Sequence, residues 1–146
     1  MKRFFIFFAL FVGALSAHSF DFDGIDLNST YIKVAREISK RGYIYDNERN
    51  CLKGNCQGTE IYLSINYIDV TKKDMVGQLI VDVPLDNSPY TWTSVTTIFN
   101  VVYHQVGKTD NSITYQVDRD GTQLVVSQKD NSIILTYNTP YYKQRK

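Results

Sequence analysis

The sequence predicts an α+β fold of tandem αβββ units, in which two helices pack on a largely antiparallel sheet. Two segments carry apolar residues at the three- and four-residue spacing of a helix, and each is followed by three extended segments separated by turn residues. Each unit opens at an Asn-Ser dipeptide, and its helix closes at a glycine. This order predicts two candidate repeats, at residues 26–85 and 86–140.

The first unit begins with a short amphipathic helix. Ser29 offers an N-cap, and Tyr31, Ala35 and Ile38 then fall on one helical face. Basic and acidic residues occupy the opposite face, and Gly42 is suited to the position just past the helix end. We therefore expect a helix from about Ser29 to Gly42.

Three strands are expected to follow this helix. They lie at residues 43–52, 60–70 and 75–83, and Pro84 ends the last one. The second strand alternates Ile61, Leu63 and Ile65 with polar or aromatic residues, which is the pattern of a strand with one buried face. Tyr62 points away from Ile61 and Leu63, so one of these two sets is exposed to solvent unless helices cover both faces.

The second unit repeats this order. Ser88 offers an N-cap and Pro89 a favourable first position, and Gly107 closes the segment. The apolar residues between them recur at helical spacing: Trp92, Val95, Phe99, Val102 and Val106. The many Thr and Val residues lower the helix propensity, so this helix is predicted from periodicity against propensity. Three strands follow at 113–118, 122–128 and 132–138, with turns at Asp120-Gly121 and Asp130-Asn131.

The first nineteen residues are typical of a signal peptide. Lys2 and Arg3 form a positive start, residues 4–15 are apolar, and residues 17–19 form a small-residue cleavage site before Phe20. The apolar run is shorter than the roughly 20 residues needed to span a bilayer. No cysteine at the cleavage site could accept a lipid. We therefore expect export to the periplasm or the medium, with residues 20–146 forming one α+β domain.

Composition excludes some classes of function. Removing 19 of the 146 residues leaves 127, enough for one domain with a real core. Without Lys2 and Arg3 the 16 basic residues become 14, against 15 acidic ones, so the mature chain is nearly neutral. A nucleic-acid partner normally requires a clear basic excess on one face, so none is expected.

Cys51 and Cys56 are the two cysteines of the chain. In an exported protein an even number of cysteines favours a disulfide, and Gly54-Asn55 between them is typical of a tight turn. We therefore expect the bond Cys51–Cys56 across a hairpin end. A redox-active pair is disfavoured because the spacing is not Cys-x-x-Cys. A structural zinc site needs four nitrogen or sulfur ligands, so no metal and no cofactor are expected.

Several short motifs resemble those of a group of small exported Bacteroidetes proteins of unknown function. The stretch from Phe22 to Leu27 reads Phe-x-Gly-Ile-x-Leu, and the first helix ends in Lys40-Arg41-Gly42-Tyr43. Residues 97–100, then 106–108 and a final β-meander complete the resemblance, although relatives often have more residues and further cysteines after Gly107. In outline the chain is also similar to β-lactamase inhibitor protein and to the small lipoprotein of the outer-membrane assembly machine. These are protein-binding modules, so the resemblance implies protein binding.

A few residues could in principle be catalytic or bind a metal ion, but each has a simpler structural interpretation. His104 lies between Val102 and Val106, where a partly exposed helical histidine is expected, because a general base requires a nucleophile and an orienting carboxylate around it. Asp118 and Asp120 resemble part of a calcium loop, but no terminal Glu completes it and a hairpin turn explains them. No catalytic residue is assigned.

The mature chain keeps all 11 tyrosines. Tyrosines anchor protein interfaces and stack on sugars, so several of them form a candidate binding surface: Tyr62, Tyr90, Tyr137, Tyr141 and Tyr142. The simpler alternative is that they form cross-strand pairs along the outer sheet face. The leading hypothesis is a non-enzymatic periplasmic module that binds an envelope or extracellular protein. The alternative is a small-ligand or glycan binder, or a hydrolase with an unrecognised site.

Overall fold

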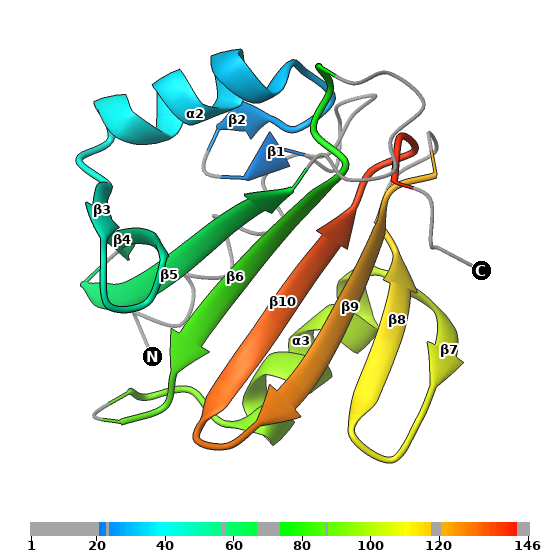
Figure 1. Ribbon diagram of the computed structural model, residues 1–146. Coiled ribbons are helices and arrows are strands. Elements are labelled where there is room, and N and C mark those ends of the chain that lie inside the picture. The colour runs from blue at the N-terminus through cyan, green and yellow to red at the C-terminus, as the bar shows by residue number, and fades with distance from the viewer. Residues whose placement is uncertain are drawn as a thin grey trace.

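In the computed structural model, a short hairpin and a helix precede four strands, and a second helix precedes four more (Figure 1). The first group is β1 (Asp21–Phe22), β2 (Ile25–Asp26), α2 (Tyr31–Lys40), β3 (Ile44–Asp46), β4 (Cys51–Cys56), β5 (Thr59–Asn66) and β6 (Gln78–Pro84). The second group is α3 (Trp92–Val102), β7 (His104–Lys108), β8 (Ser112–Gln116), β9 (Gln123–Lys129) and β10 (Ser132–Asn138). The described residues are 21–22, 24–56, 58–66, 74–86, 88–117 and 121–142, so the predicted signal peptide lies outside them.

One eight-stranded antiparallel sheet dominates the fold, with the order β3-β4-β5-β6-β10-β9-β8-β7. The last strands of the two four-stranded groups, β6 and β10, pair at its centre in a register that runs from Ser132↔Pro84 to Asn138↔Gln78. The predicted two-helix α+β packing is therefore wrong, because the fold is sheet-rich and has a helix of 10 and a helix of 11 residues among its described elements. Each helix precedes four strands rather than three.

The two additional strands lie where the sequence patterns were misleading. Residues 43–52 were expected to form one strand, but a turn at residues 47–50 divides the segment between β3 and β4. Asn50 adopts a positive φ of 53° in this turn, a conformation that asparagine tolerates better than most residues. The other additional strand is β7, which occupies the segment expected to complete the second helix.

The dipeptide Gly54-Asn55 led to the prediction of a tight turn where the structure has the strand β4. Gly54 lies in the middle of the strand, directly before Asn55, and pairs with Ile61 of β5. A Cβ atom at this position would lie 2.2 Å from Cδ1 of the buried Tyr43 ring. The glycine therefore provides close approach between a strand and an aromatic ring rather than a turn.

The α2 helix forms largely as predicted. Its N-cap is Thr30 instead of Ser29, and the Thr30 hydroxyl accepts a hydrogen bond from the backbone N–H of Lys33 at 3.3 Å. Val34 and Ile38 are fully buried one turn apart, and Gly42 with φ +86° follows the last turn. This short helix thus buries one apolar stripe and exposes its charged face.

The α3 helix is shorter than predicted at both ends. Its N-cap is Thr91, which forms a capping box with Ser94, so Ser88 precedes the helix as part of a turn. The helix ends at Val102, since Tyr103 has extended backbone. The apolar periodicity therefore predicted the buried Val95 and Phe99 correctly. It also predicted helix up to Val106, which is wrong. No helix among the described residues is long and apolar enough to cross a membrane.

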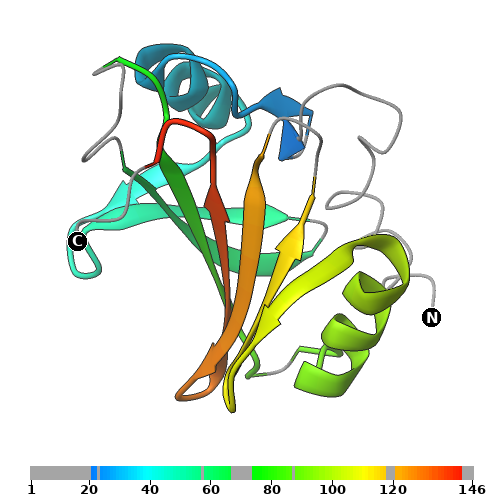
Figure 2. The same ribbon diagram turned by 90° about the vertical axis from the view of Figure 1, so that its right-hand side faces the viewer.

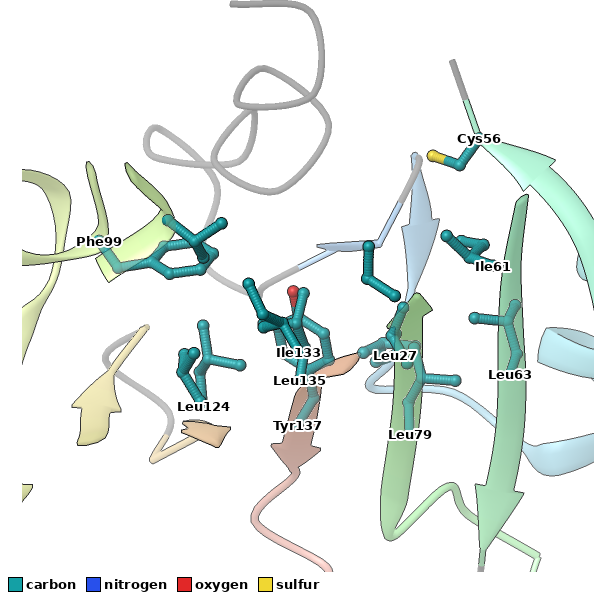
Figure 3. Packing of buried hydrophobic residues seen from close by; sticks show 14 of the residues in the cluster. Leu27, Cys56, Ile61, Leu63, Leu79, Phe99, Leu124, Ile133, Leu135 and Tyr137 are labelled. Carbon is teal, nitrogen blue, oxygen red and sulfur yellow. The ribbon is translucent and has the colours of Figure 1, made fainter. Parts of the chain in front are cut away.

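Both helices cover the same face of the sheet, which we call the inner face. Figure 1 shows α3 behind the central strands and α2 at one end of the sheet, and Figure 2 shows β4 and β5 running across the direction of β8 and β9 because of the strong twist. In Figure 3, Leu27 lies near Leu79, and Phe99 of α3 lies near Leu124. The inner-face residues alternate along each central strand, as in Leu79, Val81 and Val83 of β6 and Ile133, Leu135 and Tyr137 of β10.

Candidate functional site

The opposite side of the sheet, which we call the outer face, is the candidate functional surface. Its residues alternate with the core residues, and those of the central strands are half-buried rather than fully buried. In Figure 1 the central strands β6, β10 and β9 face the viewer with no described helix in front of them. An antiparallel sheet with one covered face commonly leaves its other face to solvent or to a partner.

A cluster of four side chains lies on the outer face at the β4–β5 pair, which we call the Tyr62 cluster: Arg49, Lys53, Glu60 and Tyr62. The Tyr62 hydroxyl donates to Glu60 Oε1 at 2.5 Å, and Lys53 Nζ lies 3.6 Å from Glu60 Oε2. The Arg49 guanidinium lies 4.4 Å from the centre of the Tyr62 ring. Tyr62 is 7% exposed although it lies on the outer face, so this cluster covers its ring with polar and charged groups.

The turn between β3 and β4 holds Arg49 in place. Asp46 Oδ1 accepts hydrogen bonds from the backbone N–H groups of Glu48 at 2.9 Å and Arg49 at 3.1 Å. Asp46 Oδ2 also lies 3.5 Å from the Arg49 guanidinium. The backbone hydrogen bond from Arg49 is the main reason that the pKa of Asp46 lies below its ordinary value. Because Asp46 is ionised, it fixes both the turn and the arginine on top of Tyr62.

Two further groups lie beside the Tyr62 cluster. Asp82 of β6 is the register partner of Tyr62, and its Oδ1 is buried without a hydrogen bond among the described residues. Cys51 of β4 pairs with Asp46 and is half-buried. Burial, followed by the nearby Asp46 charge, raises the pKa of the Cys51 thiol, so it is a poor nucleophile at neutral pH. The orphaned Asp82 oxygen is the more informative feature, since buried acceptors normally have a donor.

The hydrogen bond to Glu60 is also the main reason that the pKa of Tyr62 is raised, with burial second. The same bond lowers the pKa of Glu60. Tyr62 is therefore a neutral phenol that donates to a carboxylate at neutral pH. This arrangement is suited to holding side chains in fixed positions for recognition, and the tyrosine hydroxyl is not activated as a nucleophile or base.

A second feature of the outer face is a row of amide side chains along one end of the strands, which we call the amide row. Asn66 Nδ2 donates to Gln78 Oε1 at 3.0 Å, and Gln78 Nε2 donates to Asn138 Oδ1 at 2.9 Å. Successive register pairs continue the line onto β9, β8 and β7. In strand order the line contains Asn66, Gln78, Asn138, Gln123, Gln116 and His104.

The structure separates the tyrosines that were predicted to form one surface. Tyr137 is fully buried on the inner face and Tyr90 is 3% exposed, so both belong to the core and their assignment to a binding surface is wrong. Tyr141 and Tyr142 are half-buried just after β10. Only Tyr62 of the predicted set lies on the outer face among the strands. Aromatic residues of a sheet alternate between its faces, and register rather than composition decides which face each one takes.

The cysteines do not form the predicted bond. No disulfide joins Cys51 and Cys56, which are the first and last residues of β4. Extended backbone rises about 3.3 Å per residue, so their Cα atoms are far beyond the separation that a disulfide spans. They also face opposite sides of the sheet, because their positions differ by an odd number. Cys56 is buried in the core and Cys51 lies on the outer face.

His104 is not helical as predicted, because it opens the edge strand β7 and is exposed there. Its register partner is Gln116, at the end of the amide row. Among the described residues no group of three or more His, Cys, Asp and Glu side chains could hold a metal ion. The Asp118–Asp120 motif lies outside the described residues.

Comparison of the chain with protein-family models, with curated proteins and with solved structures gave no match. The resemblance to small exported Bacteroidetes proteins therefore stays a prediction from the motifs.

Sequence reasoning missed Arg49 and the amide row. A signal for the row does exist, because each member is the first or last residue of its strand. That signal becomes readable only when the strand boundaries and the register are known, since antiparallel neighbours contribute alternately their first and last residues to one row. Arg49 lies five positions before Gly54, where the predicted turn Gly54-Asn55 begins, and nothing in its sequence context indicates a contact with Tyr62.

Proposed function

We propose that this protein is a non-enzymatic module of the cell envelope that binds another protein through the Tyr62 cluster on the outer face of its sheet. The observation that carries the proposal is Arg49 stacked on Tyr62 on a sheet face that no described helix covers. Tyrosine and arginine are enriched among the few residues that dominate binding energy at protein interfaces. Here they are already ordered before any partner arrives, which reduces the entropic cost of association.

The chemistry around the cluster indicates what the partner supplies. Asp82 Oδ1 lies beside Tyr62 without a hydrogen bond from a described residue, and leaving a buried acceptor unpaired is unfavourable. A donor from the partner, such as a backbone N–H or a basic side chain, would pair with Asp82 once the side chains around it adjust. We therefore infer a protein partner that places a hydrogen-bond donor against the centre of the outer face.

A binding role also fits the chemical state of the cluster better than catalysis does. Tyr62 is kept protonated by Glu60, and Glu60 is paired with Lys53. Nucleophilic catalysis requires a group whose pKa is lowered or that lies beside a general base. In the Tyr62 cluster the pKa of Tyr62 is raised and the pKa of Glu60 is lowered. Tyr62 therefore stays protonated and Glu60 stays ionised at neutral pH, so the tyrosine is not activated as a nucleophile.

Envelope localisation is part of the same proposal and is supported by the signal-like start of the sequence. Export would remove residues 1–19 and leave a chain that begins at Phe20. Amino-terminal sequencing of protein recovered from the periplasm or the medium tests this step. A chain that keeps Met1 and stays in the cytoplasm would contradict the envelope assignment.

Affinity capture with matched variants tests the binding proposal. Immobilised mature chain is incubated with envelope extract, in parallel with Arg49→Ala and Arg36→Ala. Arg36 is an exposed arginine on α2, away from the outer face, so it controls for the loss of one positive charge. We expect a retained protein whose affinity falls at least tenfold with Arg49→Ala, and by less than twofold with Arg36→Ala.

Two outcomes would contradict this proposal. One is that no protein is retained above background, or that its retention is equal for both arginine variants. The other is reproducible turnover in a substrate screen that Arg49→Ala and Tyr62→Phe leave unchanged, because this would place an enzymatic site elsewhere. Circular dichroism of each variant confirms that the fold is intact before binding is compared.

A further inference from the structure

The amide row is a second structured feature of the outer face, and the proposed protein contact does not use it. It crosses the strands at one end of the sheet, whereas Tyr62 lies four residues away from Asn66 along β5. Its first three members are joined by two hydrogen bonds, at 3.0 and 2.9 Å, which fix the orientation of their amide groups. The row is therefore an ordered array of polar groups on a surface that no described helix covers.

The hydrogen bonds within the row leave capacity for a ligand. A carboxamide has two N–H donors and two acceptor lone pairs. The bond from Asn66 uses one lone pair of Gln78, and the bond to Asn138 uses one Gln78 N–H. Gln78 therefore retains one donor and one acceptor, and Gln123 is exposed on the next strand of the row. Gln78 and Gln123 thus offer groups that can both donate and accept.

The spacing of the row limits the kind of ligand that matches it. Neighbouring strands lie about 4.8 Å apart, so successive amides repeat at that interval. An extended peptide repeats at about 3.3 Å per residue, and it normally pairs along a sheet edge rather than across the strands. A pyranose ring is close in length to the amide interval, and its hydroxyl groups each donate and accept. A chain of sugar rings therefore matches both the repeat and the chemistry of the row.

The lack of charge in the row and the aromatic residues near it also favour a chain of sugar rings as the ligand. The five amides are uncharged, so they offer no ion pair to an acidic or basic ligand. Directly after Asn138, Thr139 Oγ1 donates to the carbonyl of Val76 at 2.6 Å and anchors the turn that contains Tyr141 and Tyr142. These tyrosines are half-buried at the end of β10, beside the row in the sequence. Tyrosine rings are suited to contact with the apolar faces of sugars.

We propose that the amide row binds a neutral, hydroxyl-rich oligosaccharide that lies across the strand ends. The line from Asn66 to Gln116 involves five strands, a span of about 19 Å at 4.8 Å per step, which accommodates about four sugar rings. Gln78 and Asn138 lie near its centre and hold the chain by paired hydrogen bonds. Recognition depends on neutral hydroxyl groups, so binding is insensitive to ionic strength.

Affinity electrophoresis tests the inference with soluble neutral glycans as probes. The mature chain is run in native gels that contain xyloglucan, galactomannan, arabinoxylan or soluble starch, beside gels that contain no glycan. The variants are Gln78→Ala and Gln123→Ala in the row, with Gln128→Ala as the control. Gln128 is an exposed glutamine on the same strand as Gln123, but it pairs with the inner-face residue Ile133 and lies outside the row.

We expect retardation in at least one glycan gel, a tenfold or greater loss of affinity in each row variant, and less than a twofold change with Gln128→Ala. Added salt at 0.5 M, where the Debye length is only about 4 Å, should leave the retardation unchanged because no charge pairs are formed. Gln123 is exposed, so its variant keeps the fold even if Gln78→Ala does not.

Three results would overturn this inference. If none of the glycans retards the protein, neutral polysaccharides of these types are excluded as ligands and the proposed glycan site is contradicted. Retardation that the row variants leave unchanged would place any glycan site elsewhere. If the row variants instead abolish retention of a captured envelope protein, the amide row belongs to a protein interface. These outcomes are distinguishable from failure of the protein-binding proposal, which depends on Arg49 and not on the amides.

Discussion

Substituting Gly54 by alanine is the most direct test of the packing between β4 and the segment before β3. A Cβ atom added to Gly54 would lie 2.2, 2.4 and 2.6 Å from three atoms of the Tyr43 ring. Tyr43 is only 4% exposed, so its ring has little room to move away. Gly54→Ala therefore forces the ring or the strand out of its position, although alanine is otherwise a small and conservative change.

The magnitude follows from two opposing effects. Overpacking of a filled core costs about 1–3 kcal/mol. Replacing a glycine in the middle of a strand by alanine normally stabilises by about 0.5–1 kcal/mol, because glycine loses more backbone freedom on folding. The clash dominates here because all three contacts are shorter than Cβ atoms tolerate. We expect Gly54→Ala to lower the free energy of unfolding by up to about 2.5 kcal/mol, which is the overpacking cost less the backbone gain.

A double-mutant cycle with Tyr43→Ala isolates the contact. Tyr43→Ala alone should cost roughly 3–5 kcal/mol, as for other large aromatic truncations in cores. Once the ring is gone, the added methyl group has space, so Gly54→Ala should stabilise the Tyr43→Ala protein by about 0.5–1 kcal/mol. The two substitutions should therefore couple by the overpacking cost alone, about 1–3 kcal/mol, measured by urea denaturation of the four proteins.

Gly107→Ala is the matched control, since Gly107 also lies in a strand but its nearest neighbour would be 3.7 Å from an added Cβ. It should be neutral or slightly stabilising. The reasoning would be refuted if Gly54→Ala were as harmless as Gly107→Ala. It would also be refuted if the effects of Gly54→Ala and Tyr43→Ala simply added, as expected for a glycine in an open turn.

Three further predictions concern the core, the tyrosines and the thiols. Phe99→Ala should lower the free energy of unfolding by about 3–5 kcal/mol, whereas Val101→Ala, 83% exposed on the same helix, should change it by less than about 0.5 kcal/mol in urea melts. Burial raises the pKa of Tyr137 well above its ordinary value, so its contribution to stability is complete below the unfolded pKa of about 10 and is lost as pH rises through the folded pKa. Phenolate absorbance should therefore show a tyrosine that ionises only on alkaline unfolding, and full titration before unfolding would contradict this. Mature protein purified without reductant and then unfolded should contain two titratable thiols, Cys51 and Cys56, and finding none would contradict the absence of a disulfide between them.

Some features of the fold could be predicted from local patterns because they depend on neighbours in the chain. The alternation of Ile61, Leu63 and Ile65 predicted a strand with one buried face at β5, since side chains of a strand alternate between faces. The final meander was predicted close to its observed bounds, because Asp130-Asn131 is a strong turn signal between two alternating strands. Ile38 likewise followed from helical spacing, whereas the buried Val34 lies outside the predicted face of Tyr31, Ala35 and Ile38.

Other local signals were misleading because tertiary contacts outweighed them. Gly54-Asn55 has the composition of a turn, but the glycine provides room for the Tyr43 ring inside a strand. The apolar spacing from Trp92 continues to Val106, but pairing of residues 104–108 with β8 satisfies their backbone groups as an edge strand. A β-branched segment is a poor helix former, so the sheet pairing wins there.

The sequence by itself determined the signal-like start, the two helical stripes and most of the strands that alternate apolar and polar residues. The tertiary structure decided everything that depends on register between distant segments. It moved Tyr90 and Tyr137 into the core, separated Cys51 from Cys56, placed Arg49 on Tyr62, and aligned amides from five strands in one row. The physical reason is that a shift of one residue in pairing moves every side chain of a strand to the other face, and local composition does not fix that pairing.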